Sequence, residues 1–168
     1  MFDFELFKTI VFSEPKLWLY IGVFLLIVLI YHGLIQLYYR YRLKKSGIND
    51  IDKMKGRTFE EYLRVLYQSH GYHVTLTPSS GDYGADLILK KEGATIVVQA
   101  KRYTKNVGVK AVQEVVGAKE YYHATRAWVV TNRGYTGPAI KLAKANQVKL
   151  IGRDQLISQM IVFNKKQV

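Results

Sequence analysis

Three residues in one strand–turn–strand segment carry most of the chemistry that this sequence offers. Residues 81–103 read GDYGADLILKKEGATIVVQAKRY. Side chains alternate between the faces of a strand, so Gln99 and Lys101 share one face, and Asp86 opens the strand across the turn. The Asp86 carboxylate, the Gln99 amide oxygen and the Ala100 carbonyl then converge. A few oxygen ligands with open positions for water are typical of a hard cation such as Mg²⁺.

The Lys101 ammonium beside these oxygens has two chemical uses. It could orient or help deprotonate a water, or stabilise negative charge that builds on phosphate oxygens. A cation that acidifies a water, with positive charge near a phosphate, is what phosphodiester hydrolysis requires. Alternatively, Gln99 and Lys101 decorate a solvent-facing strand while Asp82 and Asp86 serve the turn. The joint pattern D-x12-Q-x-K favours a site.

The elements that must position these residues follow the order αβββαβαβα. The first helix begins at Thr58, where Thr58-x-x-Glu61 fits a capping box. The expected strands are 72–78, 85–91, 95–102, 126–132 and 148–152, and the later helices are 109–123, 136–146 and 154–163, with Thr136 as a cap. The β-α-β connections predict an α/β fold, a mixed sheet flanked by helices on both faces.

Residues 57–152 resemble the catalytic domain of Mrr-type restriction endonucleases, in the PD-(D/E)xK nuclease superfamily. The matching stretches are FEEYLRVLYQSHGYHV, GDYGADLILKKEG, IVVQAKRY, VQEVVGAKEYYHA and WVVTNRGYTGPAIKLA. The resemblance implies a restriction-endonuclease-like fold and a metal-dependent DNA endonuclease that uses Mg²⁺, or Mn²⁺ in its place. It places Asp86, Gln99 and Lys101 in the core motif, and glutamine at the acidic position is what this branch of the superfamily shows.

The resemblance also implies a glutamate on the first helix, which matches Glu60. The sequence supports Glu60 over its neighbour Glu61, because Glu61 is expected to serve the capping box. Members of the family known for restriction usually add a separate DNA-reading domain, and here a hydrophobic segment takes that place. A preference for modified DNA is therefore not carried over to this chain.

Polar residues after the core motif are candidates for DNA contacts. Arg102, Lys105 and Lys110 could neutralise backbone phosphates, and Gln113 could point to the site from the next helix. The alternative is a solvated, charged turn. The net charge of +12 favours a polyanionic partner, and the absence of cysteine excludes disulfides and cysteine-ligated zinc.

The N-terminal part of the chain predicts a membrane span. Residues 17–37 contain no charged residue, and at 1.5 Å per residue they cover about 31 Å. Arg40, Arg42, Lys44 and Lys45 follow, so the positive-inside rule places the C-terminal domain in the cytoplasm, on the inner face of the cytoplasmic membrane. A cleaved signal peptide fits poorly because the basic cluster follows the apolar run. A buried core helix would be unusual with no polar side.

These observations divide the chain into an interfacial segment (1–16), a transmembrane helix (17–39), a basic linker (40–57) and an endonuclease domain (58–163). The expected partners are DNA and the lipid bilayer, and a homodimer is left open. Two alternatives to the enzyme remain: a non-catalytic, membrane-tethered nucleic-acid-binding protein, and a membrane-anchored assembly protein. The Asp86, Gln99 and Lys101 set favours the enzyme, since a binding protein has no need of it.

Overall fold

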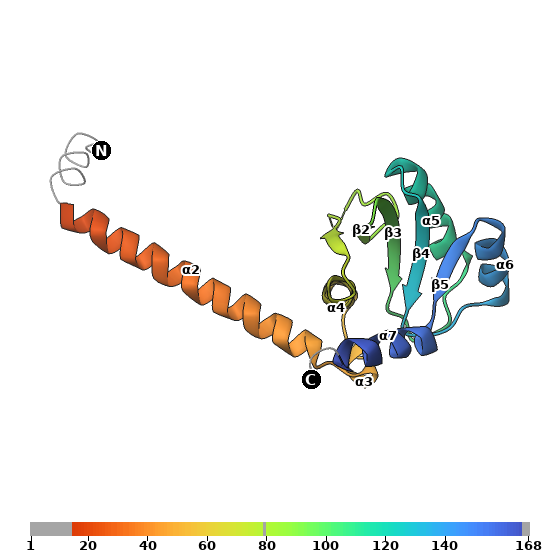
Figure 1. The fold of residues 1–168 in the computed structure, drawn as a ribbon, viewed down its shortest axis with the longest axis horizontal. Coiled ribbons are helices and arrows are strands. Elements are labelled where there is room, and N and C mark those ends of the chain that lie inside the picture. The colour runs from red at the N-terminus through yellow and green to blue at the C-terminus, as the bar shows by residue number, and fades with distance from the viewer. Residues whose placement is uncertain (1–14, 79, 166–168) are drawn as a thin grey trace, which may run out of the picture. The chain divides into compact units, whose positions relative to one another are not determined.

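The computed structural model describes residues 15–78 and 80–165. It divides the chain into two compact units, residues 1–41 and 42–168, which are considered separately (Figure 1). The interfacial segment expected over residues 1–16 lies outside the described residues, apart from its last two.

The described part of the first unit is one long helix, α2 (Pro15–Lys44), whose last three residues belong to the second unit. Its stretch Lys16–Leu43 has a mean hydropathy of 2.3 with none of its most apolar window buried in the protein. Large apolar side chains such as Phe24, Leu29 and Leu37 are exposed around the helix. A helix of this length and composition is a candidate membrane span by these two criteria alone.

The second unit contains the predicted succession of elements. It comprises α3 (Ile48–Ile51), α4 (Gly56–Ser69), β1 (His73–Leu76), β2 (Leu87–Lys91), β3 (Ala94–Lys101), α5 (Val109–Tyr121), β4 (Arg126–Thr131), α6 (Gly137–Ala145), β5 (Val148–Ile151) and α7 (Arg153–Lys165). From α4 onward the order is αβββαβαβα, as expected from the sequence.

The five strands form one sheet in the order β1-β2-β3-β4-β5. The β1–β2 and β2–β3 pairs are antiparallel, and the β3–β4 and β4–β5 pairs are parallel. The parallel pairs are joined by crossovers through α5 and α6, as parallel connections require. The mixed sheet confirms the predicted fold class. It also places β3 at the centre, with β2 on one side and β4 on the other.

Alternation along β3 divides the hydrophobic core into two layers. Ile96 and Val98 join a cluster built with α4 and α7, whereas Val97 joins a cluster built with α5 and α6. Helices therefore cover both faces of the sheet (Figure 1). Each fully buried aliphatic side chain contributes about 1.5–3 kcal/mol. With both faces of β3 buried, its register is fixed, because a shift of one residue would exchange the faces.

The structure contradicts the prediction that residues 40–57 form a linker, because residues 40–44 end α2 and Ile48–Ile51 form α3. Ile51 in α3 is fully buried, and Leu43 and Met54 are nearly so, all within the cluster of α4 and α7. The Asp52 carboxylate lies 2.9 Å from Arg153 and accepts a hydrogen bond from Asn132. The basic side chains of this segment made it resemble a linker, while its few apolar side chains pack into the domain.

The predicted capping box is also wrong. Helix α4 begins at Gly56 with Lys55 as N-cap, and no side chain caps it. Thr58 therefore lies inside the first turn, and the Glu61 carboxylate pairs with Arg64 at 2.6 Å. By contrast, the cap predicted for α6 is confirmed, because the Thr136 hydroxyl accepts a hydrogen bond from the Ala139 N–H.

Candidate active site

Asp86 is fixed by backbone pairing at the point where β2 begins. Its N–H donates to the Val98 carbonyl at 2.8 Å, and its carbonyl accepts from the Thr77 N–H at 3.1 Å. The Thr77 hydroxyl also donates to the Ala85 carbonyl at 2.6 Å. The backbone of Asp86 is thus held between the chains that form β1 and β3, which fixes the direction of its Cα–Cβ bond.

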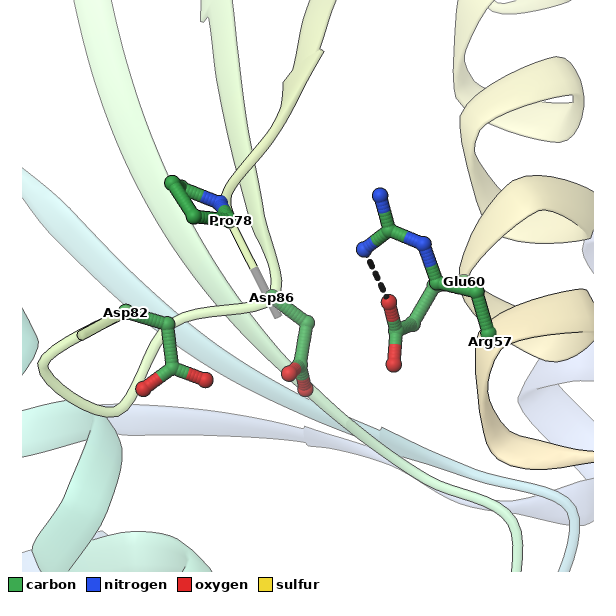
Figure 2. A pocket seen from close by; sticks show the side chains of 5 residues that line it. All are labelled: Arg57, Glu60, Pro78, Asp82 and Asp86. Carbon is green, nitrogen blue, oxygen red and sulfur yellow. Dashed lines mark hydrogen bonds and ion pairs between the residues drawn. The ribbon is translucent and has the colours of Figure 1, made fainter. Parts of the chain in front are cut away.

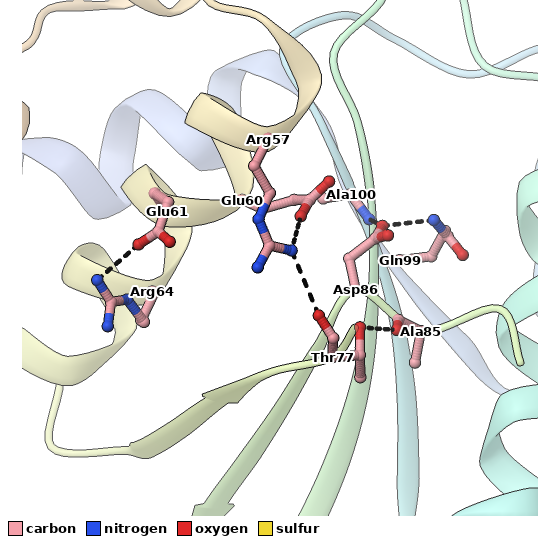
Figure 3. Close-up of polar contacts among 9 residues, drawn as sticks. All are labelled: Arg57, Glu60, Glu61, Arg64, Thr77, Ala85, Asp86, Gln99 and Ala100. Atoms are coloured by element: carbon pink, nitrogen blue, oxygen red, sulfur yellow. Dashed lines mark hydrogen bonds and ion pairs between the residues drawn. The ribbon is translucent and has the colours of Figure 1, made fainter. Parts of the chain in front are cut away.

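The Asp86 carboxylate meets two groups of β3. Its Oδ2 accepts a hydrogen bond from the Ala100 N–H at 2.7 Å and a short one from the Gln99 side-chain amide (Figure 3). The structure therefore brings together Asp86, Gln99 and Ala100, as the alternation argument required. Their role as cation ligands stays a prediction.

Burial raises the pKa of the Asp86 carboxyl to about 6. The negative charges of Glu60 and Asp82 act in the same direction, while the Ala100 N–H and the Lys101 ammonium oppose it. The ionised form of a carboxyl with a raised pKa is stabilised by a cation placed beside it. Perturbed acidic groups of this kind are common at functional sites.

A pocket of about 300 Å³ lies over Asp86, lined by Arg57, Glu60, Pro78, Asp82 and Asp86. Figure 2 shows the Asp86 carboxylate between those of Asp82 and Glu60. The three carboxylates come from α4, the glycine-rich turn and the start of β2. The Arg57 guanidinium donates to Glu60 at 2.8 Å and to the Thr77 carbonyl at 3.3 Å. Among the residues that line the pocket, three acids face one base, so the pocket favours a cation.

Glu60, and not Glu61, reaches this pocket. The sequence analysis also favoured Glu60, but it did so because Glu61 was expected in a capping box that the structure does not contain. The physical reason is instead the position on α4: Glu60 lines the pocket over Asp86 at the start of β2, while Glu61 pairs with Arg64 (Figure 3).

Lys101 forms an ion pair that the sequence analysis did not foresee. Its ammonium lies 2.9 Å from the Glu114 carboxylate of α5. Burial alone would lower the pKa of Lys101, but the carboxylates of Glu114 and Asp86 outweigh burial and hold that pKa above its ordinary value. A signal for Glu114 was present, because it stands on the same helical face as the buried Ala111, Val115 and Ala118.

The glycine-rich turn packs directly on α5 at Glu114. Gly84 has a φ of +92°, and a Cβ at this position would lie 2.3 Å from the Glu114 carbonyl oxygen. Only glycine fits both the backbone conformation and the close approach. The turn that carries Asp82 and Asp86 and the helix that holds Lys101 are therefore positioned against each other.

Family comparison settles the identity of this domain. A family model for the Mrr catalytic domain, described as a restriction endonuclease, matches residues 51–160. The chain belongs to the restriction endonuclease family. The match begins at Ile51, which agrees with the packing of α3 into the domain.

Solved structures resemble this restriction endonuclease domain at low sequence identity. The DNA modification-dependent restriction endonuclease AspBHI matches with a TM-score of 0.54 and 18% identity, over 73% of this chain and 35% of that chain. A protein of unknown function, AF1548, matches with a TM-score of 0.48 and 18% identity, over 55% of each chain. MspJI in complex with a 27-mer oligonucleotide matches with a TM-score of 0.41 and 20% identity, over 76% of this chain and 30% of that chain.

The likeness to AspBHI supports the fold alone. The chain spans about half or less of the length of these proteins. A search of curated proteins found no match.

The candidate site of this restriction endonuclease domain has oxygen donors of the kind that fits a divalent cation. Within residues 15–78 and 80–165, no three His, Cys, Asp or Glu side chains gather as a metal cluster. The donor set expected from the sequence is mixed: the Asp86 carboxylate, the Gln99 amide and the Ala100 carbonyl. The Glu60 carboxylate lines the same pocket. The Gln99 amide nitrogen faces Asp86, and its Oε1 is buried without a hydrogen-bond partner. Rotation of the amide would present this orphaned oxygen to a cation beside Asp86.

The residues predicted to contact DNA do not all face the candidate site. Arg102 and Lys105 line a shallow hollow of about 350 Å³ with Tyr103 and Thr104. Lys110 is exposed, 3.9 Å from Glu114. Gln113 is exposed, and the residue of α5 that reaches Lys101 is its neighbour Glu114. DNA contact by these four residues stays a prediction.

Proposed function

We propose that this protein is a membrane-anchored DNA endonuclease that hydrolyses phosphodiester bonds with a divalent cation. One observation carries the proposal. Asp86, with a raised pKa and a hydrogen-bonded Gln99 whose oxygen has no partner, stands in an acidic pocket next to Lys101. Carboxylates and an amide oxygen beside an ammonium are the groups that cation-assisted phosphodiester hydrolysis uses.

The ligands in this proposal are the Asp86 and Glu60 carboxylates, the Gln99 amide oxygen and the Ala100 carbonyl. All are oxygen donors, which favours Mg²⁺, with Mn²⁺ as a substitute. A cation held there supplies charge neutralisation at the phosphate and acidifies a water. Arg57 forms a 2.8 Å ion pair with Glu60 and so holds that carboxylate at the pocket.

The role of Lys101 follows from its ion pair. Because the pKa of Lys101 is held above its ordinary value, the side chain is an ammonium at neutral pH. A permanently protonated lysine cannot accept a proton from water. Of its two chemical uses, the proposal therefore assigns it the second: stabilisation of negative charge on the phosphate oxygens.

DNA is the proposed substrate because the domain belongs to the restriction endonuclease family and is basic. Residues 58–168 contain sixteen Lys and Arg against eight Asp and Glu. Arg102, Lys105 and Lys110 are proposed to contact backbone phosphates, which position a protein without reading bases.

The proposed location is the cytoplasmic membrane. Helix α2 supplies the span, and the basic cluster after it keeps the endonuclease domain on the cytoplasmic side. The domain then meets DNA in the compartment that holds the chromosome.

Plasmid nicking by the full-length chain in lipid nanodiscs tests this function. We expect relaxation of supercoiled DNA in Mg²⁺ or Mn²⁺, none in EDTA, and none with Lys101→Ala. Lys141→Ala, an exposed lysine of α6, is the matched control and should cut normally. Cutting in EDTA, or undiminished cutting by Lys101→Ala, would contradict the proposal.

A further inference from the structure

Two tyrosines form an exposed aromatic stack beside the candidate site. The rings of Tyr83 and Tyr121 lie 3.7 Å apart at an interplanar angle of 19°. The two residues remain 58% and 52% exposed. Tyr122 packs edge-on against Tyr121 at 4.9 Å and 87°. Tyrosines that serve a hydrophobic core are buried like Tyr62 and Tyr67 of α4, whereas this pair presents its aromatic surface to solvent.

Backbone conformation and contacts of the neighbouring residues hold this stack in place. Tyr83 has a φ of +51°, a conformation that bulky residues rarely adopt and that stores strain. Gly84, the next residue, is locked against the backbone of Glu114. The Tyr122 hydroxyl donates to the Asp82 carbonyl at 3.3 Å. These contacts join the end of α5 to the glycine-rich turn and fix the exposed rings relative to the acidic pocket.

The aromatic stack lies close to the candidate site, because Tyr83 is adjacent in sequence to a residue that lines the acidic pocket. Asp82 lines the acidic pocket, and the next residue is Tyr83. Only three peptide units separate Tyr83 from Asp86, so their Cα atoms lie within about 11 Å. Successive nucleotides of one strand rise about 3.4 Å along duplex DNA. A nucleotide within about three positions of a phosphate at Asp86 can therefore reach the rings.

We propose that the Tyr83–Tyr121 pair is a stacking platform for an unpaired nucleobase of the DNA bound at this site. Aromatic side chains bind bases through their faces and tolerate any sequence. In a perfect duplex both faces of each base are covered by its neighbours, so only an unpaired, mismatched or terminal base can use the platform. The inference rests on the proposed function and narrows its substrate to DNA with unpaired bases near the cut.

The test measures equilibrium binding of the full-length chain in nanodiscs by fluorescence anisotropy, in EDTA so that no cutting occurs. The probes are a short labelled duplex and the same duplex with one unpaired adenine. Wild type should bind the second about 5- to 150-fold more tightly, the range expected for stacking one base. Tyr83→Ala and Tyr121→Ala should lose that preference and keep duplex affinity. Tyr83→Phe should retain it, since the ring and not the hydroxyl stacks.

Ile140→Ala, an exposed apolar residue of α6, is the control for loss of apolar surface and should keep the preference. Equal binding of both probes by wild type, or an unchanged preference in both alanine variants, would overturn the platform. Failure of the proposed function gives a different result: no binding of either probe, or no cation-dependent nicking. Retained duplex affinity in the alanine variants shows that they fold.

Discussion

Lys101 of β3 and Glu114 of α5 form an ion pair at 2.9 Å, and Gly84 packs against the backbone of that same glutamate. The lysine of the core motif is therefore held by a helix that the motif does not include. Removing the partner should displace the ammonium from the phosphate that it is proposed to stabilise.

Glu114→Gln should lower kcat for DNA cleavage about 10- to 100-fold with little change in KM, because misplacement of a catalytic group affects mainly the transition state. Glu120→Gln changes an exposed acid of the same helix and should leave both constants unaltered. Steady-state nicking rates measure the effect. A normal kcat for Glu114→Gln would show that the ion pair has no positioning role.

Asp86→Asn tests whether the buried negative charge of Asp86 lowers the free energy of unfolding. The folded-state pKa of about 6 exceeds the unfolded value of 3.8, so the folded protein binds the proton more tightly. In EDTA the wild type should therefore lose stability as pH rises from about 4 through 6, by at most about 3 kcal/mol. The asparagine variant should lack this loss.

Unfolding of both proteins in urea between pH 4 and 8 measures the Asp86 contribution. The free-energy gap in favour of the variant should open as pH rises. A wild type that gains stability relative to Asp86→Asn over this interval would mean that the carboxylate is already stabilised in the folded state without a cation.

Gly84→Ala and Gly81→Ala form a matched pair. Both glycines have positive φ, +92° and +72°, but an added Cβ at Gly81 meets nothing within 4 Å. The conformational penalty alone should destabilise Gly81→Ala by about 1–2 kcal/mol. Gly84→Ala should lose about 1–3 kcal/mol more, because Glu114 must move. Thermal melting compares them, and equal losses would show that the close approach adds nothing.

The boundary of the domain gives a further prediction. A chain that begins at Lys53 lacks the buried Ile51 and the Asp52 partner of Arg153. It should be less stable than a chain that begins at Arg42 by several kcal/mol, since loss of one large buried side chain costs about 2–5 kcal/mol. Melting temperatures of the two fragments measure the difference. Coincident melting curves would restore the linker interpretation.

The proximity of Asp86, Gln99 and Ala100 could be predicted because it depends only on two neighbouring strands and the short turn between them. The two-residue period of β3 separates Gln99 from Ala100, and the short β2–β3 turn sets both opposite Asp86. Glu114 was missed because the helical pattern places it on the buried side of α5 but does not say which strand residue that side meets. Helix α3 was missed because four residues are too few for a helical period to appear.

The central claim is that Asp86 is required for cation-dependent cleavage of DNA. Initial nicking rates of the full-length protein, measured across a Mg²⁺ titration for wild type, Asp86→Ala and the Lys141→Ala control, test it most directly. The account predicts saturable rates for wild type and the control, and none for Asp86→Ala at any Mg²⁺ concentration. Equal rates for Asp86→Ala and wild type would contradict it.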